Sequence, residues 1–430
     1  MCISVAIGPN LDVPSGGDLT VIDADNDIVV PGFVNGHHHL WQQLIRGVAT
    51  DWSLFDYLVK IRSLYVSVYT AEDVELAYYT GAMDLLSNGV TCMLEHSHTI
   101  NSAEHADAAI RGLKRAGIWG CFCYGFYENP PIDGCHVPGV DLEKFDHTQR
   151  VCDARRVRTT MIPLKISPLS GSHRRSPRGG TASREQRHPG SISVFSHGAS
   201  LTDSELNSIR SASAGLVGTP NTELQMGMGF PAVFGAADKG CKACLGLDIT
   251  LNQGSNFMAQ MRLALQAQRA VDNQAAFPLA IKRKTTEVLR MGTLGGAEVM
   301  GLEHLVGSVV VGKRADLVVF RYDDISTVPV YDPTAKVVFH ASSSNIDTVI
   351  VNGRTVKKDG CLVGVDWPSY ERGNNSARSG PADQARAFSL TYLYHLCAVY
   401  LHSCMMPVLF CSRQIPFISQ AMIRLAAEQA

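Results

Sequence analysis

The sequence predicts an α/β protein built as a (β/α)8 barrel of the TIM type, with a small β-sandwich formed by both ends of the chain. Apolar, strand-like runs alternate with amphipathic helical patterns between about residues 28 and 305, which argues for repeated βα units and a parallel sheet. Shorter alternating runs lie outside this region, near the N-terminus and between residues 306 and 365. A length of 430 residues suits one large barrel with a small second domain.

Seven barrel strands are predicted as apolar runs bounded by turn or polar residues. They cover residues 28–35, 91–96, 118–124, 159–166, 191–195, 214–218 and 243–247. The helices between them begin and end at recognisable signals. Thr70 and Asp73 are placed to cap the helix that follows them, and residues 202–205 form a second capping box. Gly117 is placed to end the helix that begins at residue 103.

The eighth strand of the barrel is missing from the sequence pattern. It should lie between residues 166 and 191, but residues 172–190 contain five arginines, several glycines and prolines, and no apolar run. This composition is typical of a solvated linker, and it lacks the interleaved aromatic residues of a nucleic-acid-binding patch. We therefore expect one βα unit of the barrel to be poorly preserved, with an irregular basic insert in its place.

The domain boundaries follow from these patterns. The barrel is expected over residues 28–305, and the β-sandwich would combine residues 1–27 with 306–365, because neither piece is large enough to stand alone. Residues 366–430 form a C-terminal appendage. Within it, residues 388–412 are uncharged and long enough to span a bilayer, but two histidines and a proline favour a packed or poorly ordered segment.

Composition and charge exclude several classes of protein. Lys and Arg number 38 and Asp and Glu 40, so the net charge is −2 and no basic field favours nucleic acid. Apolar residues make up 45% of the chain, which excludes a disordered protein. The twelve cysteines show no disulfide framework and no secretory leader is recognisable, so we expect a cytoplasmic protein with reduced thiols. Cys241 and Cys244 are expected to be buried rather than to form a redox or zinc half-site.

The most informative stretch is His37-His38-His39, which follows the first predicted barrel strand. Side chains two residues apart on a strand point the same way, so His37 and His39 can present two imidazoles to one ion. Barrel active sites lie at the C-terminal ends of the strands, where this pair is found. Three adjacent histidines can also be a surface tract, but the apolar strand before them favours a metal site.

Two further residues fit the same mouth of the barrel. His197 and Asp248 each follow a predicted strand. Imidazoles and one carboxylate around an open coordination position make a metal ion a hydrolytic catalyst, because the ion lowers the pKa of its water to about 7 and the carboxylate can take the proton. Taken singly, His197 would more often be a structural histidine and Asp248 a helix cap. Their placement after barrel strands favours a shared site.

These motifs resemble the amidohydrolase superfamily, in the branch of cytosine deaminase-like enzymes, triazine hydrolases and 8-oxoguanine deaminase. The similar segments occur in the family's order within residues 5–365. They are Asn35–Arg46, Glu95–His98 with Glu104–Asp107, His197–Glu205, Thr219–Gly229, Leu245–Asp248 and Gly307–Leu317.

The resemblance implies a metal-dependent barrel in which His37, His39 and Asp248 are the metal ligands. Asp248 would also be the catalytic proton shuttle, and His197 would polarise the substrate or help to bind the ion. The ion would be zinc or another divalent metal such as iron. The resemblance also implies a small-molecule substrate, and homo-oligomers are common in the family.

Gln42 and Glu223 match positions near the substrate in the family, although either residue could simply stabilise a loop. The chain departs from the family pattern in the gap at residues 172–190, where a further metal-binding histidine and usually a glutamate are expected. The leading hypothesis is a hydrolase that cleaves a carbon–nitrogen bond, or a carbon–chlorine bond, of a small heterocycle. The alternative is a degenerate barrel that serves as a binding or scaffold protein.

Overall fold

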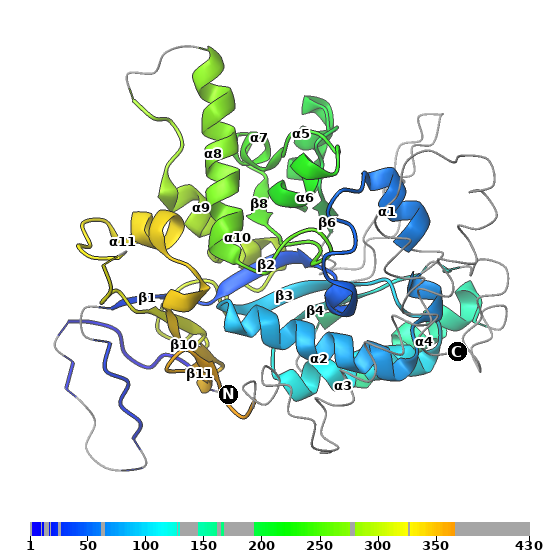
Figure 1. Cartoon of the computed structure of the whole chain (residues 1–430), viewed down its shortest axis with the longest axis horizontal. Helices are drawn as coiled ribbons and strands as arrows, with labels where there is room; N and C mark the ends of the chain where they lie inside the picture. The colour runs from blue at the N-terminus through cyan, green and yellow to red at the C-terminus, as the bar shows by residue number, and fades with distance from the viewer. Residues whose placement is uncertain are drawn as a thin grey trace, which may run out of the picture.

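The computed structural model describes most of the chain up to residue 365 (Figure 1). The described residues are 2–9, 11–12, 17, 19–24, 27–61, 65–126, 128–129, 145–160, 165–166, 193–275, 280–325 and 327–365. The predicted basic insert at 172–190 and the appendage at 366–430 lie outside them. No helix in the described ranges combines the length and the apolar character needed to cross a lipid bilayer.

Two parallel sheets form the centre of the molecule. The first has the order β2-β3-β4-β5 and consists of β2 (Phe33–His38), β3 (Val90–Ser97), β4 (Trp119–Tyr124) and β5 (Lys165–Ile166). The second has the order β6-β7-β8 and consists of β6 (Val194–Ser196), β7 (Gly215–Gly218) and β8 (Lys242–Leu245). An isolated parallel bridge between His38 and Asp248 joins the end of β2 to the segment after β8.

The expected closed barrel is only partly confirmed. Within the described residues the seven strands run parallel and in chain order, but the two sheets do not close on each other. The open side lies between β5 and β6, which flank residues 167–192, outside the described ranges. The strand predicted over 159–166 is corrected at its start, because α4 (His147–Thr160) covers its first two residues. Of the described residues in that range, Lys165 and Ile166 pair with β4.

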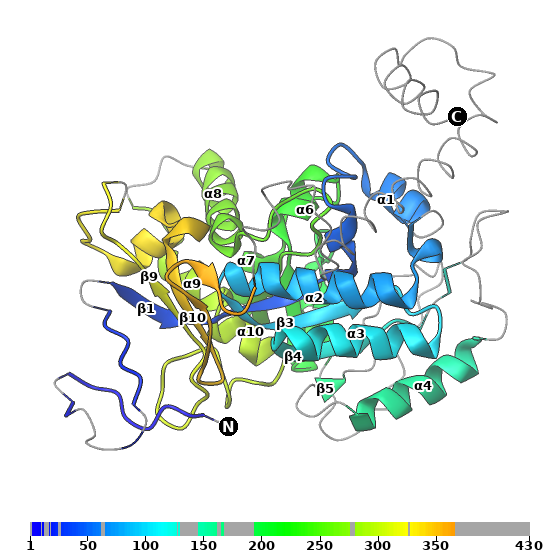
Figure 2. The same ribbon diagram turned by 60° about the horizontal axis from the view of Figure 1, so that its bottom comes forward.

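Helices cover the outer face of the first sheet. Both views show α2 (Ala71–Ser87) and α3 (Ala103–Ala116) lying side by side along β3 and β4 (Figures 1 and 2). They approach closely at Gly112, where a Cβ atom would lie 2.6 Å from the carbonyl oxygen of Glu75. The predicted capping box of Thr70 and Asp73 is present at the start of α2. The strands beneath are buried throughout, as parallel strands covered on both faces should be.

The remaining helices and turns connect the strands. They are η1 (Leu40–Ile45), α1 (Leu54–Lys60), η3 (Val66–Val68), α5 (Asp203–Ser211), α6 (Pro220–Gln225), α7 (Val233–Asp238), α8 (Phe257–Ala275), α9 (Thr285–Met291), α10 (Leu294–Val299), α11 (Pro333–Ala335), η4 (Lys336–His340) and η5 (Ser343–Asn345). The predicted capping box at residues 202–205 opens α5, and Gly117 ends α3 with a φ of 77°. Cys241 and Cys244 are buried, as expected.

A smaller antiparallel sheet lies beside the parallel ones. Its order is β1-β9-β10-β11-β12, with β1 (Ile28–Pro31), β9 (Leu317–Phe320), β10 (Ile346–Val351), β11 (Arg354–Lys358) and β12 (Cys361–Leu362). The expected sandwich from both chain ends is not confirmed. Among the described residues before β1, pairing is limited to a bridge between Ile3 and Arg314.

The single strand predicted over residues 28–35 is in fact two strands in two sheets. The chain leaves the antiparallel sheet after β1, passes Gly32 and enters the parallel sheet as β2. A Cβ atom at Gly32 would collide with the side chain of Thr91 on β3, so the crossing requires glycine. A continuous apolar run predicts strands here but does not indicate that they belong to different sheets.

Asp316 links the small antiparallel sheet to the first parallel sheet through hydrogen bonds. Its carboxylate accepts hydrogen bonds from the indole Nε1 of Trp119 at 2.6 Å and from the backbone N–H of Asn352 at 2.6 Å. Its carbonyl oxygen accepts from the N–H of Gly32 at 2.9 Å. Because Asp316 and Trp119 are both buried, the indole N–H has no water to replace the carboxylate.

We predict that Asp316→Ala destabilises the protein by roughly 1–3 kcal/mol, because the buried indole N–H of Trp119 and the half-buried N–H of Asn352 lose their acceptor. Urea unfolding followed by tryptophan fluorescence measures the change. Asp316→Asn keeps one carbonyl oxygen in place and should lose less. Equal stability of the alanine variant and the natural protein would show that this contact does not hold the two sheets together.

Candidate metal centre

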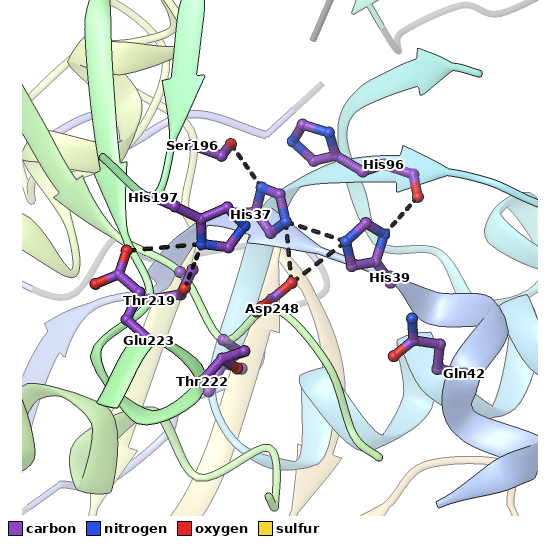
Figure 3. A network of polar contacts seen from close by, with 12 residues as sticks. His37, His39, Gln42, His96, Ser196, His197, Thr219, Thr222, Glu223 and Asp248 are labelled. Atoms are coloured by element: carbon purple, nitrogen blue, oxygen red, sulfur yellow. Dashed lines mark hydrogen bonds and ion pairs between the residues drawn. The ribbon is translucent and has the colours of Figure 1, made fainter. Parts of the chain in front are cut away.

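Three side chains from distant parts of the sequence converge at the end of β2 (Figure 3). Nε2 of His37 lies 3.0 Å from Oδ1 of Asp248, and Nε2 of His39 lies 3.3 Å from the same oxygen. The two Nε2 atoms are 3.1 Å apart. All three side chains are buried, and their donor atoms lie within 4.8 Å of one another. The structure therefore brings together the three residues that were predicted as metal ligands.

Backbone hydrogen bonds hold the two segments in this register. The N–H of Asp248 donates to the carbonyl of His37, and the N–H of His39 donates to the carbonyl of Asp248, both at 2.9 Å. The side-chain oxygen of Asn35 accepts from the N–H groups of His37 and Leu247. Asp248 has a φ of 64°, a left-handed conformation that non-glycine residues adopt at a cost of about 1–3 kcal/mol. Its surroundings therefore force the carboxylate into place.

The second nitrogen of each imidazole is held by a hydrogen bond. Nδ1 of His39 lies 2.8 Å from the carbonyl oxygen of His96. A carbonyl can only accept, so His39 carries its proton on Nδ1 and its Nε2 offers a lone pair. Nδ1 of His37 lies 2.6 Å from Oγ of Ser196, which comes from β6 in the other sheet. Such contacts orient imidazoles toward metal ions in many proteins.

This donor set fits a divalent cation. Two imidazole nitrogens and a carboxylate oxygen are electron-rich, and at 3.0–3.3 Å they repel one another unless a proton or a cation lies between them. Two His and one Asp are ligands that zinc and related divalent metals accept. Two imidazoles and one carboxylate leave a coordination position for water or substrate, as in catalytic rather than structural sites.

The electrostatics also match the state that metal binding requires. Burial lowers the pKa of His37 to about 4, even though Asp248 opposes the shift. Burial alone would raise the pKa of Asp248, but the adjacent imidazoles of His37 and His39 hold it well below its ordinary value, because either ring can stabilise the carboxylate when it carries a proton. Near neutral pH the site therefore has a neutral imidazole at His37 beside an ionised carboxylate, and ligands must be deprotonated to bind metal.

His197 lies beside the three donors but outside their group. Its ring centroid is 4.9 Å from that of His37, and its backbone has a φ of 70°. Nδ1 of His197 contacts Oγ1 of Thr219 at 2.9 Å and lies 3.6 Å from Oε1 of Glu223. Burial lowers the pKa of His197, but the contacts with Glu223 and Asp248 outweigh it and the net shift is upward. Glu223 therefore lies on the Nδ1 side of the His197 ring and favours its protonated form.

A cavity of about 370 Å³ opens in front of the site. Its lining includes His37, His39, His197 and Asp248. Gln42 and Glu223, predicted to bind substrate, are buried behind this lining and are not part of it. Gln42 donates instead to the hydroxyl of Tyr57 at 2.6 Å, and Tyr57 lines the cavity. Direct substrate contacts of Gln42 and Glu223 stay predictions.

Sequence reasoning did not identify Ser196, Tyr57 or His96 as parts of the site. His96 is buried on β3, its ring centroid is 4.0 Å from that of His37, and its Nε2 has no hydrogen-bond partner among the described residues. The spacing of His96 and His98 could have indicated His96, because these two histidines are two residues apart at the end of β3, as His37 and His39 are at the end of β2. No local signal marks Ser196 or Tyr57, because their partners are far away in the sequence.

Glu95 supports the turn that follows His39. Its Oε2 accepts a hydrogen bond from the N–H of Leu40, the first residue of η1, at 3.0 Å. The carboxyl group is completely buried, and burial raises its pKa to about 8. Glu95 is therefore protonated near neutral pH in the folded protein, unlike in the unfolded chain.

Comparison with known proteins gives a consistent result. The profile described as "Amidohydrolase family" matches residues 28–167 and 169–356. A 5-methylthioadenosine/S-adenosylhomocysteine deaminase of Pyrococcus furiosus is 24% identical over 387 residues, which cover 82% of this chain and 88% of that protein. A 5'-deoxyadenosine deaminase of Methanosarcina barkeri is 22% identical, over 81% of this chain and 85% of that protein.

Solved structures resemble the fold over most of the chain. An adenosine deaminase of Xanthomonas campestris with bound zinc aligns with a TM-score of 0.66 and 17% identity, over 85% of this chain and 87% of its own. An atrazine chlorohydrolase of Arthrobacter aurescens complexed with zinc aligns with a TM-score of 0.69 and 18% identity, over 90% of this chain and 94% of its own. At these identities the likeness concerns the fold.

We predict that Glu95 makes the protein less stable as the pH rises. The folded pKa of about 8 exceeds the value of 4.5 for an unperturbed carboxyl, so the folded state binds one more proton between these limits. Stability from this proton is complete below pH 4.5 and is lost as the pH rises through about 8, by about 1.4 kcal/mol per pH unit. Urea unfolding with chelator, between pH 5 and 8, measures the slope.

Glu95→Gln should reduce the slope of the unfolding free energy against pH by about 1.4 kcal/mol per pH unit, because the amide does not titrate. Glu75→Gln is the matched control, since the carboxylate of Glu75 lies at the surface against Arg111. Indistinguishable slopes for Glu95→Gln and the natural protein would contradict the prediction.

Proposed function

Because the chain belongs to the amidohydrolase family, we propose that it is a metal-dependent hydrolase that cleaves a carbon–nitrogen bond of a small heterocycle and releases ammonia. The observation that carries the proposal is the convergence of His37, His39 and Asp248 in front of a cavity. The deaminases of Pyrococcus and Methanosarcina, similar over more than four fifths of their length, support the reaction type. The chlorohydrolase neighbour makes carbon–chlorine cleavage the second candidate.

Zinc is the metal we propose, and His37, His39 and Asp248 would hold it. Two solved neighbours that contain zinc support this choice. When bound, such an ion lowers the pKa of a coordinated water to about 7 and so supplies a nucleophile near neutral pH. Iron would suit the same donors.

The residues of this chain would then direct the reaction. The water oxygen forms a bond to the ring carbon while Asp248 accepts a proton from the water. The electron pair of the attacked carbon–nitrogen double bond would move to the ring nitrogen, which takes the second proton of the water. Asp248 would pass the first proton to the leaving amino nitrogen, so that the exocyclic carbon–nitrogen bond breaks, ammonia departs and the ring carbon becomes a carbonyl. His197 would donate a hydrogen bond to the substrate through Nε2, because its Nδ1 already contacts Thr219. Such positioned groups contribute typically 10²–10⁴-fold to a rate.

The test is metal content together with ammonia release. We predict that the full chain binds one zinc ion, and that the double variant His37→Ala, His39→Ala loses both the metal and ammonia release from aminopurines, aminopyrimidines and aminotriazines. Plasma emission spectroscopy on protein freed of loose metal gives the stoichiometry. His38→Gln is the matched control, because His38 lies between the two ligands but is not one of the three donors.

Stoichiometric zinc in the double variant would place the metal elsewhere and reject this site. A natural protein that binds no zinc and releases no ammonia would favour the alternative function, a binding or scaffold protein on a degenerate barrel. Circular dichroism of each variant separates loss of the ion from loss of the fold.

We predict that Ser196→Ala weakens zinc binding about 10–100-fold, because Nδ1 of His37 loses the hydroxyl that orients it. Competition with a chromophoric chelator measures the affinity. Ser200→Ala is the control, since Ser200 lines the same cavity without contacting a predicted ligand. Equal affinities of the two variants would show that Ser196 does not position His37.

A further inference from the structure

One wall of the cavity is apolar and comes from two segments that are distant in sequence. Leu54 and Leu58 of α1 form part of it, and Met226 and Met228, after α6, form another part. Both views place α1 near α6 (Figures 1 and 2). The N–H of Leu54 donates to the carbonyl of Met226 at 3.0 Å, which ties the two segments together. We call these four residues the apolar wall.

The local sequence orients α1 so that its apolar side meets the cavity. Residues three and four apart share one face of a helix, so Leu54 and Leu58 lie together on α1. Asp56 and Lys60 lie four residues apart on α1 and form an ion pair at 3.0 Å, so each charged group has a partner on the helix itself. Ser53 and Asp56 form a capping box that fixes where α1 begins. The helix period and the capping box therefore fix the position of the two leucines of the apolar wall on α1.

The charge of the lining restricts what can be bound beside this wall. Among the described residues that line the cavity there is no lysine and no arginine, and the only carboxylate is that of Asp248. A phosphate or carboxylate on a substituent beside the apolar wall would lose water there without gaining a lysine or arginine partner among the described lining residues, which is unfavourable. An alkyl group would instead gain by leaving water, by about fourfold in affinity for each buried CH2.

We propose that the apolar wall is a subsite for an uncharged alkyl substituent on the heterocycle that the enzyme hydrolyses. This inference rests on the proposed function, because it assumes that the heterocycle lies with its reacting carbon at His37, His39 and Asp248. The substituent extends from the ring toward Leu58, which is 48% exposed at the edge of the cavity. The subsite selects neutral, alkyl-substituted rings over those that carry an acidic group.

The test uses zinc-loaded full chain and 6-aminopurines that carry methyl, ethyl, propyl or carboxypropyl groups at N9. The expected result is a rise in kcat/KM of about fourfold for each added CH2. The carboxypropyl compound should fall below the methyl compound. Titration calorimetry with metal-free protein measures binding of the same series without turnover, so the subsite is tested even where no ammonia is released.

Substitutions on α1 localise the effect. Leu58→Lys should abolish the gain along the alkyl series and should improve the carboxypropyl compound relative to the propyl compound. Phe55→Lys is the matched control, because Phe55 lies on the same helix, is 75% exposed and does not line the cavity. The control should keep the alkyl series intact.

The outcomes separate the two proposals. Turnover of the methyl compound with no gain along the alkyl series overturns the subsite and leaves the proposed function standing. A gain in binding without ammonia release supports the subsite and rejects the proposed reaction for these rings. Equal effects of Leu58→Lys and Phe55→Lys overturn the assignment of the subsite to the apolar wall.

Discussion

The site depends on one contact between distant parts of the chain, the short parallel bridge between the end of β2 and the segment after β8. Two backbone hydrogen bonds form it, and they set His37, His39 and Asp248 in a fixed relation. Ser196 adds a link from the other sheet by contacting His37. Because these contacts are buried, the imidazoles and the carboxylate cannot relax away from one another, and their mutual repulsion becomes an affinity for cations.

Much of this site could be predicted from the sequence, because its signals are local. The alternation of His37 and His39 follows from the period of a strand, and Asp248 directly follows an apolar run. The two capping boxes and the helix end at Gly117 could be predicted from the sequence in the same way. The split at Gly32 was not, because periodicity identifies a strand without identifying its sheet. The predicted substrate contact of Gln42 stays a prediction, because Gln42 donates to Tyr57 and only tertiary packing decides which polar residue of a loop lines the cavity.

The surroundings of the site divide the roles between the residues. Burial keeps His37 neutral, while the adjacent imidazoles of His37 and His39 keep the pKa of Asp248 low. Glu223 raises the pKa of His197, which faces the same cavity, whereas burial lowers the pKa of His37. The deaminases of Pyrococcus and Methanosarcina are similar to this chain at 24% and 22% identity over most of its length. The apolar wall comes from α1 and the segment after α6, outside the β-strands, and the connecting segments of a barrel change more readily than its strands.

The bridge joins residues about 210 positions apart, and this separation constrains how the protein is made. A ribosome that has released β2, β3 and β4 has produced two imidazoles but no carboxylate to complete the group. The donors can meet only after residue 248 has emerged from the exit tunnel, so the emerging chain cannot assemble the three-donor group early in its synthesis. Any metal held by this group can therefore be bound only late in synthesis, and until then the first sheet depends on its own packing and strand pairing.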